Sequence, residues 1–153
     1  MKESITLKEY KVLDTSVIIF MLFPFLFLAY IYFIGSGDII GFISKNPKVT
    51  ISFIGAMIVP FVGIGLKNIK KMLINEKLDV ALVSLILLLL SQIFFFNIIG
   101  IVAIGFLSFK IGKSRGIKIK GIGEKVKGEY SFFIFNGIIL LLSVMCFMLS
   151  YRL

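Results

Sequence analysis

The sequence contains no histidine, no tryptophan and a single cysteine, Cys146, among its 153 residues. Zinc and haem iron are held mainly by histidine or by several cysteines, so these shortages argue against an ordinary zinc or haem site. One cysteine also leaves no disulfide and no thiol pair within the chain. We therefore expect neither a metal nor any other cofactor.

Acidic residues are also few, with 8 Asp and Glu against 17 Lys and Arg. None lies near the middle of an apolar run, where proton-coupled carriers usually keep a carboxylate. Asp14 and Asp79 stand at the edges of such runs, where we expect them to cap helix starts. Because the apolar runs hold almost no proton carriers, nucleophiles or metal ligands, we predict that the protein is not an enzyme and has no catalytic residue.

Apolar residues dominate what remains: 59% of the chain is hydrophobic, Phe occurs 17 times, and the mean hydropathy is +1.07. A soluble domain of this size could not bury so much apolar surface. The composition therefore predicts an all-α integral membrane protein, a compact polytopic helical bundle that forms one transmembrane domain over residues 1–153.

Four long apolar stretches follow one another along the chain, at residues 12–34, 49–66, 78–109 and 130–150. A membrane-spanning helix needs about 20 apolar residues. Basic residues precede the first stretch, as they do in a signal peptide. However, this stretch is too long for a signal sequence and no clear cleavage site follows it, so we expect an uncleaved first helix.

The third stretch is too long for one crossing. As a single helix, its 32 residues would measure about 48 Å, against a hydrocarbon layer of about 30 Å. Its clearly polar residues lie between Ser91 and Asn97. We therefore predict a short helical hairpin with spans at 78–92 and 95–110, which gives five crossings in all.

The distribution of basic residues supports the hairpin, because cytoplasmic loops carry an excess of Lys and Arg. A single pass through the third stretch would leave eight basic residues on one side and nine on the other. A hairpin places fourteen on the side of the N-terminus and three on the opposite side. We therefore predict a cytoplasmic N-terminus and a basic cytoplasmic loop at residues 110–129.

Small residues and amides mark the candidate contacts between helices. Small residues allow the close approach of another backbone, and proline frees a carbonyl group. Amides in lipid need partners on neighbouring helices, and three per chain are too few to enclose an aqueous path in a monomer. The predicted helix-packing residues are Gly55, Pro60, Gly63 and Gly65, and the predicted interhelical polar residues are Gln92, Asn97 and Asn136.

The basic loop is a candidate surface for anionic lipid headgroups, since each Lys or Arg near a membrane contributes about 1 kcal/mol. A purely topogenic role is the alternative. Aromatic residues are not interleaved with the basic ones before Tyr130, so we expect no nucleic-acid partner. The residues concerned are Lys113, Arg115, Lys118, Lys120, Lys125 and Lys127.

These features favour a non-enzymatic protein that packs against a larger membrane partner, as an accessory subunit or an immunity-type protector. The alternative is a small homo-oligomeric channel or transporter with its pathway between protomers. The expected partners are membrane lipid and either another integral membrane protein or a second copy of the chain. Richness in Ile, Phe and Lys with little Arg is typical of a protein of the bacterial plasma membrane.

Overall fold

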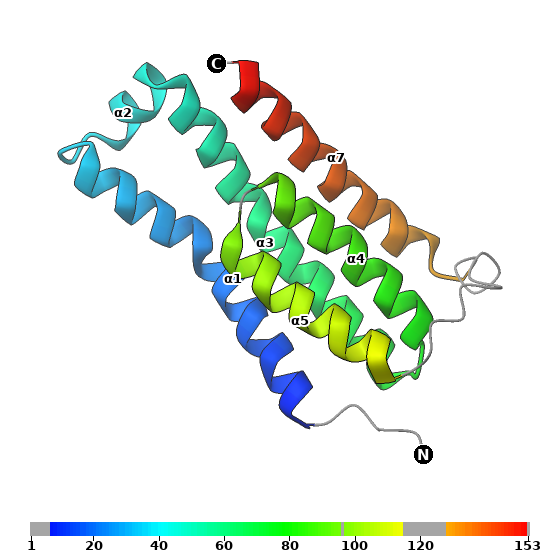
Figure 1. Ribbon diagram of the computed structural model, residues 1–153. Coiled ribbons are helices and arrows are strands. Elements are labelled where there is room, and N and C mark those ends of the chain that lie inside the picture. Colours follow the sequence, from blue (N-terminus) through cyan, green and yellow to red (C-terminus); the bar gives the residue numbers. More distant parts are fainter. Residues whose placement is uncertain (1–6, 96, 115–127, 153) are drawn as a thin grey trace.

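A computed structural model describes residues 7–95, 97–114 and 128–152 (Figure 1). Every regular element within these ranges is an α-helix, which confirms the predicted all-α class. The helices are α1 (Leu7–Ile34), α2 (Ile39–Lys45), α3 (Pro47–Ile74), α4 (Leu78–Phe94), α5 (Ile98–Ser114) and α7 (Tyr130–Arg152).

Three of the helices are long and apolar enough to cross a membrane, over Tyr10–Ile34, Pro47–Ile74 and Tyr130–Arg152. Helix α4 is equally apolar in character but has only 17 residues. The described chain is therefore a membrane-embedded helical bundle, as its composition predicts.

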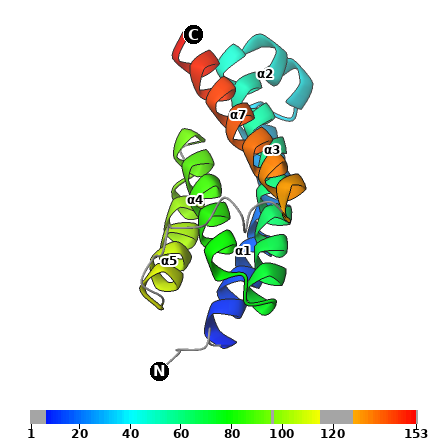
Figure 2. The same cartoon turned by 90° about the vertical axis from the view of Figure 1, so that its right-hand side faces the viewer.

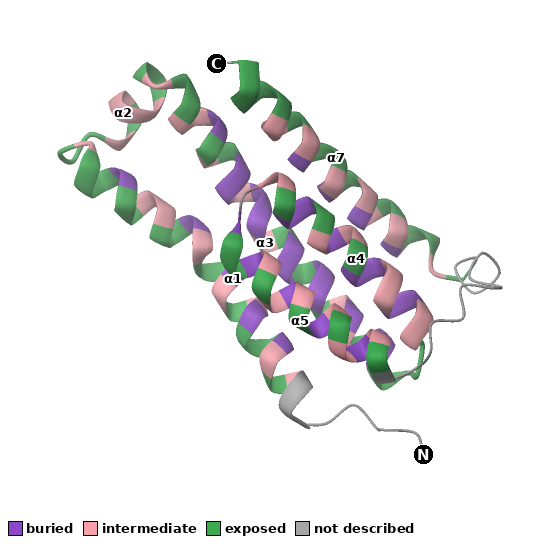
Figure 3. Cartoon of the chain, viewed as in Figure 1, coloured by how far each residue is buried: buried purple, intermediate pink, exposed green. Residues whose placement is uncertain are grey.

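Helix α3 lies at the centre of this bundle. It packs against α1 on one side and against α4 and α7 on the other, with Val62, Leu66 and Ile69 fully buried. Figure 2 shows α1, α3 and α7 beside the α4–α5 pair. Buried positions are concentrated on α3 and α4 in Figure 3, whereas α1 and α7 present much exposed apolar surface. Such surface suits contact with lipid.

Helix α3 continues past the predicted span at 49–66, so the residues expected to form a loop after Leu66 are helical as far as Ile74. Lysine, leucine and methionine are good helix formers, and a charge ends a membrane span without ending a helix. The helix stops at Asn75. Glu76 then adopts a left-handed φ of 58°, and the Lys77 N–H donates to the Met72 carbonyl at 2.9 Å, which closes the helix end.

The third apolar stretch forms two helices, α4 and α5, separated by residues 95–97 and packed against each other. The predicted pair of short helices is therefore present, while the two crossings predicted for it stay a prediction. Figure 1 shows the pair as antiparallel and alongside only one half of α3. Its tip reaches Gly55, where an added Cβ would lie 3.5 Å from the Phe95 ring. Helix α5 ends at Ser114, so residues 110–114 are helical rather than part of the expected loop.

Helix α2 was not predicted from the sequence, because it lies between the apolar stretches at 12–34 and 49–66. The Asp38 carboxylate caps it by accepting a hydrogen bond from the Gly41 N–H at 2.8 Å. Asn46 then takes an extended conformation before Pro47, which occupies the first turn of α3. A capping aspartate followed by an apolar run was the available signal.

Candidate functional site

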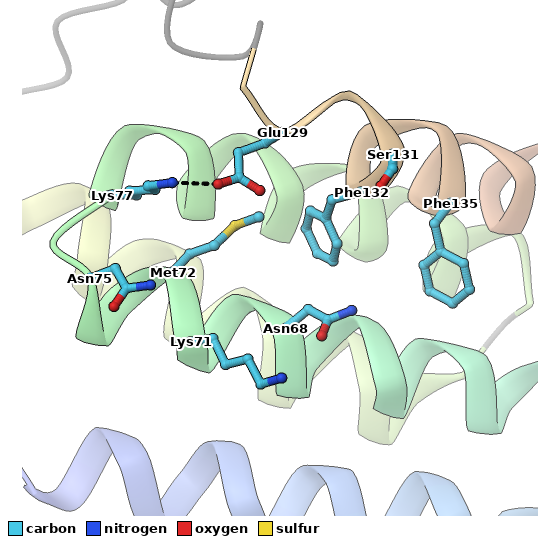
Figure 4. Close-up of a pocket in the computed structure, with 9 residues that line it drawn as sticks. All are labelled: Asn68, Lys71, Met72, Asn75, Lys77, Glu129, Ser131, Phe132 and Phe135. Carbon is cyan, nitrogen blue, oxygen red and sulfur yellow. Dashed lines mark hydrogen bonds and ion pairs between the residues drawn. The ribbon is translucent and has the colours of Figure 1, made fainter.

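A hollow of about 490 Å³ lies between the end of α3 and the start of α7, and is here called the α3–α7 hollow (Figure 4). Figure 4 shows Phe132 and Phe135 pointing from α7 toward α3, with Asn68 on the facing helix. The hollow therefore combines apolar walls with hydrogen-bonding groups. It is lined by Asn68, Lys71, Met72, Asn75, Lys77, Glu129, Ser131, Phe132 and Phe135.

The charges of this hollow are not balanced. Lys77 donates to the Glu129 carboxylate, so these two side chains form an ion pair that joins the start of α4 to the start of α7. Lys71 is exposed and has no hydrogen-bond or ion-pair partner among the residues that the structure describes. One positive charge is therefore left over at the rim.

A second hollow of about 490 Å³ lies across α3, toward α1. The Lys70 ammonium donates there to both carboxylate oxygens of Asp14 at 2.7 Å. Because α1 begins at Leu7, Asp14 does not cap its start as expected, and it pairs with α3 instead. Asp79 does lie in the first turn of α4. Lys67 and Lys71 also line this α1–α3 hollow, so Lys71 borders both hollows.

A connected set of polar groups closes the hairpin and is here called the tip lock. The Asn97 amide N–H donates to Gln92 Oε1 at 2.8 Å, and Gln92 Nε2 donates to Ser91 Oγ at 3.1 Å. Asn97 Oδ1 accepts from the Gly100 N–H at 3.1 Å, which caps the start of α5. Gln92 and Asn97, both predicted to bond between helices, thus join α4 to α5.

Asn136 lies on α7 against α3: a Cβ added at Gly65 would be 3.2 Å from Asn136 Oδ1. Both amide atoms of Asn136, like Ser84 Oγ on α4, are buried without a hydrogen-bond partner among the described residues. The interhelical bond expected for Asn136 is therefore not seen there. Three unsatisfied polar atoms are thus placed within the α3, α4 and α7 core.

The predicted packing residues of α3 face helices of their own chain. A Cβ at Gly63 would lie 3.4 Å from Phe20 Cβ on α1, and a Cβ at Gly65 would lie 3.0 Å from Leu88 Cδ1 on α4. Gly55 meets Phe95, while Pro60 stands half-buried inside the helix. The three glycine positions are therefore already covered by other parts of the same chain.

A third hollow, of about 470 Å³, lies along the C-terminal end of α7 and is here called the α7 hollow. The Phe147 ring packs edge-on against Phe94 at the tip of the hairpin, with ring centroids 5.6 Å apart. The methionines that line the α7 hollow are unbranched and flexible, so they can adapt to a partner. The lining residues are Met145, Phe147, Met148, Leu149, Tyr151 and Arg152.

Of the predicted lipid-binding residues, Lys113 is exposed in the last turn of α5. Arg115, Lys118, Lys120, Lys125 and Lys127 lie outside the described residues. Asn68, Lys71 and Asn75 were not predicted as a site, because the predicted span ends at Leu66. Continuing the helical period would have placed Asn68 and Lys71 three residues apart on one face.

Comparisons with known proteins find no matching family model, no matching curated protein and no matching solved structure. Among the described residues, no group of three His, Cys, Asp or Glu side chains could hold a metal ion.

Proposed function

We propose that the protein is a non-enzymatic component of the bacterial plasma membrane that packs against a transmembrane helix of a larger membrane protein, as an accessory subunit or an immunity-type protector. The observation that carries the proposal is the α7 hollow, whose flexible methionines and aromatic rings form an adaptable apolar surface. Met148 is 62% exposed there. Contact between Phe147 and Phe94 would pass any displacement of α7 to the hairpin.

The covered glycine positions of α3 support this assignment over the alternative channel. A pathway between protomers around Gly55, Pro60, Gly63 and Gly65 needs these residues to face another copy. Gly63 and Gly65 instead meet α1, α4 and α7 of the same chain. The buried amides also offer little to a permeating solute, since Gln92 and Asn97 are bonded to each other in the tip lock.

Photocrosslinking tests the proposed contact. A photoreactive residue replacing Met148 should give one discrete adduct in the native membrane, larger than two copies of the 17.2 kDa chain. The matched control replaces Val102, which is 65% exposed on α5, and should give none. Proteoliposomes of the purified wild type should show no ion flux. An adduct the size of two copies, together with reproducible flux, would replace this proposal with the homo-oligomeric channel.

The proposed topology has a cytoplasmic N-terminus, three full crossings by α1, α3 and α7, and a hairpin that enters from the cytoplasmic side and returns to it. In this topology, the segments at 35–48, 75–77 and 110–129 lie on the same sides of the membrane as in the five-crossing prediction. The tip of the α4–α5 hairpin, however, lies within the hydrocarbon layer. Gly55, beside the tip, is twelve residues from Lys67 and so about 18 Å along α3. The tip lock supports this depth, because polar groups in lipid need internal partners.

Labelling with an impermeant thiol reagent tests the topology in a Cys146→Ser background, because Cys146 is the only thiol. Lys71→Cys and Lys118→Cys should react from the cytoplasmic side, and Lys45→Cys from the opposite side. Ile98→Cys, at the tip, should stay unlabelled from both sides. Reaction of the residue 71 and 118 thiols from opposite sides would contradict the hairpin, and labelling of residue 98 from the side of residue 45 would restore five crossings.

A further inference from the structure

We infer that the α3–α7 hollow is a specific binding site for the headgroup of an anionic phospholipid, with Lys71 contacting the phosphate. This site is distinct from the basic loop at 110–129. It rests on the proposed topology, which puts this end of α3 on the cytoplasmic side, but it does not depend on the proposed protein partner. Its residues come from the end of α3 and the start of α7, and they are brought together only by the fold.

The position of the hollow in the membrane identifies its occupant. The uncharged part of α3, between Lys48 and Lys67, has 18 residues and measures about 27 Å, close to the thickness of the hydrocarbon layer. Asn68, Lys71 and Asn75 follow directly, so they lie at the level of the lipid headgroups. A hollow at this level is bathed in headgroups, and basic pockets between helices on the cytoplasmic side suit anionic ones.

The charges of the hollow favour an anion. Lys71 has no partner among the described residues, whereas Lys77 already neutralises the one carboxylate, Glu129. An anionic phosphate beside Lys71 would balance the remaining charge. A neutral headgroup would bring its own cation toward Lys71 and would gain less.

The other lining groups favour a lipid over a free phosphate ion. The amides of Asn68 and Asn75 and the hydroxyl of Ser131 can hydrogen-bond to the hydroxyl groups of a glycerol headgroup. Met72, Phe132 and Phe135 form an apolar wall that suits the first part of an acyl chain. A free ion would leave this wall without an occupant.

The absence of tryptophan makes a clean assay available. Phe135→Trp places a single fluorophore on the wall of the hollow, in the full-length protein reconstituted into bilayers. Quenching by phosphatidylglycerol with brominated chains is compared with quenching by brominated phosphatidylcholine. Phosphatidylglycerol should be preferred about fivefold at this position, since a lysine near the surface contributes about 1 kcal/mol. The reporter Ile138→Trp, on the exposed face of α7, should show no preference.

Lys71→Gln should abolish the preference reported by Phe135→Trp. The matched control is Lys67→Gln, one helical turn away, which lines the α1–α3 hollow only and should keep the preference. Equal loss in both variants, or no preference in the wild-type background, would overturn the site. Removal of the preference by inorganic phosphate at constant ionic strength would assign the hollow to a free anion and overturn the lipid. None of these outcomes depends on whether the α7 hollow binds a protein partner.

Discussion

Gly100→Ala should destabilise the bundle by about 1–3 kcal/mol, even though alanine is the better helix former. The added Cβ would lie 2.5 Å from Gln92 Oε1 and 3.0 Å from Asn97 Nδ2, so the tip lock could not keep its geometry. Gln92 is fully buried, and its displaced amide would find no water to bond. The cost of unpaired buried groups therefore exceeds the gain in helix propensity.

Gly105→Ala is the matched control for this experiment. Gly105 lies on the same helix, and its added Cβ would be 3.8 Å from Leu89 Cδ1, an ordinary contact. This variant should stabilise α5 by about 0.5–1 kcal/mol. The free energy of unfolding can be measured by denaturing detergent titration in mixed micelles. Equal stabilisation by the two substitutions would show that the tip lock does not contribute.

Asn136→Leu should stabilise the bundle by about 1–3 kcal/mol, the range for removing an unsatisfied buried polar group. Leucine has the same branched outline as asparagine, so it fills the same space between α3, α4 and α7. It also removes the two amide atoms that have no partner among the described residues. Thermal unfolding in detergent should show a higher midpoint for this variant.

Asn97→Leu is the matched control, because it makes the same substitution at an asparagine that is hydrogen-bonded. Asn97 donates to Gln92 and accepts from the Gly100 N–H, so its loss leaves both groups unpaired. The midpoint should fall. A loss of stability in both variants would mean that Asn136 has a hydrogen-bond partner in the membrane, such as a buried water molecule.

The sequence predicts the helical class well because bilayer chemistry leaves few choices. Apolar length locates the three long helices, and a stretch of 32 residues without an internal charge requires the turn between α4 and α5. The sequence predicts helix ends less well, because hydropathy marks the end of the membrane span and a helix can continue beyond it. Lys67 to Ile74 continue α3 beyond that limit, and Asp38 starts α2 outside it.

The candidate sites follow the same division. Gln92 and Asn97 were recognisable as amides in an apolar run, and they are close in sequence, so a tight turn brings them together. The α3–α7 hollow unites Asn68 and Lys71 with Ser131, which is distant in the chain. Helix packing alone determines that proximity. For Asn136 the sequence predicts too much. An amide in an apolar run is expected to form an interhelical hydrogen bond, but Asn136 has no such partner among the described residues.

The place of α4 has a consequence for biosynthesis. This helix packs against α3, which is made before it, and against α7, which is made after it. Until α7 has been made, the face of α4 that later contacts α7 has no protein cover and meets lipid. Nascent chains that stop before residue 130 should therefore depend on the insertion machinery and be favoured substrates of membrane proteases.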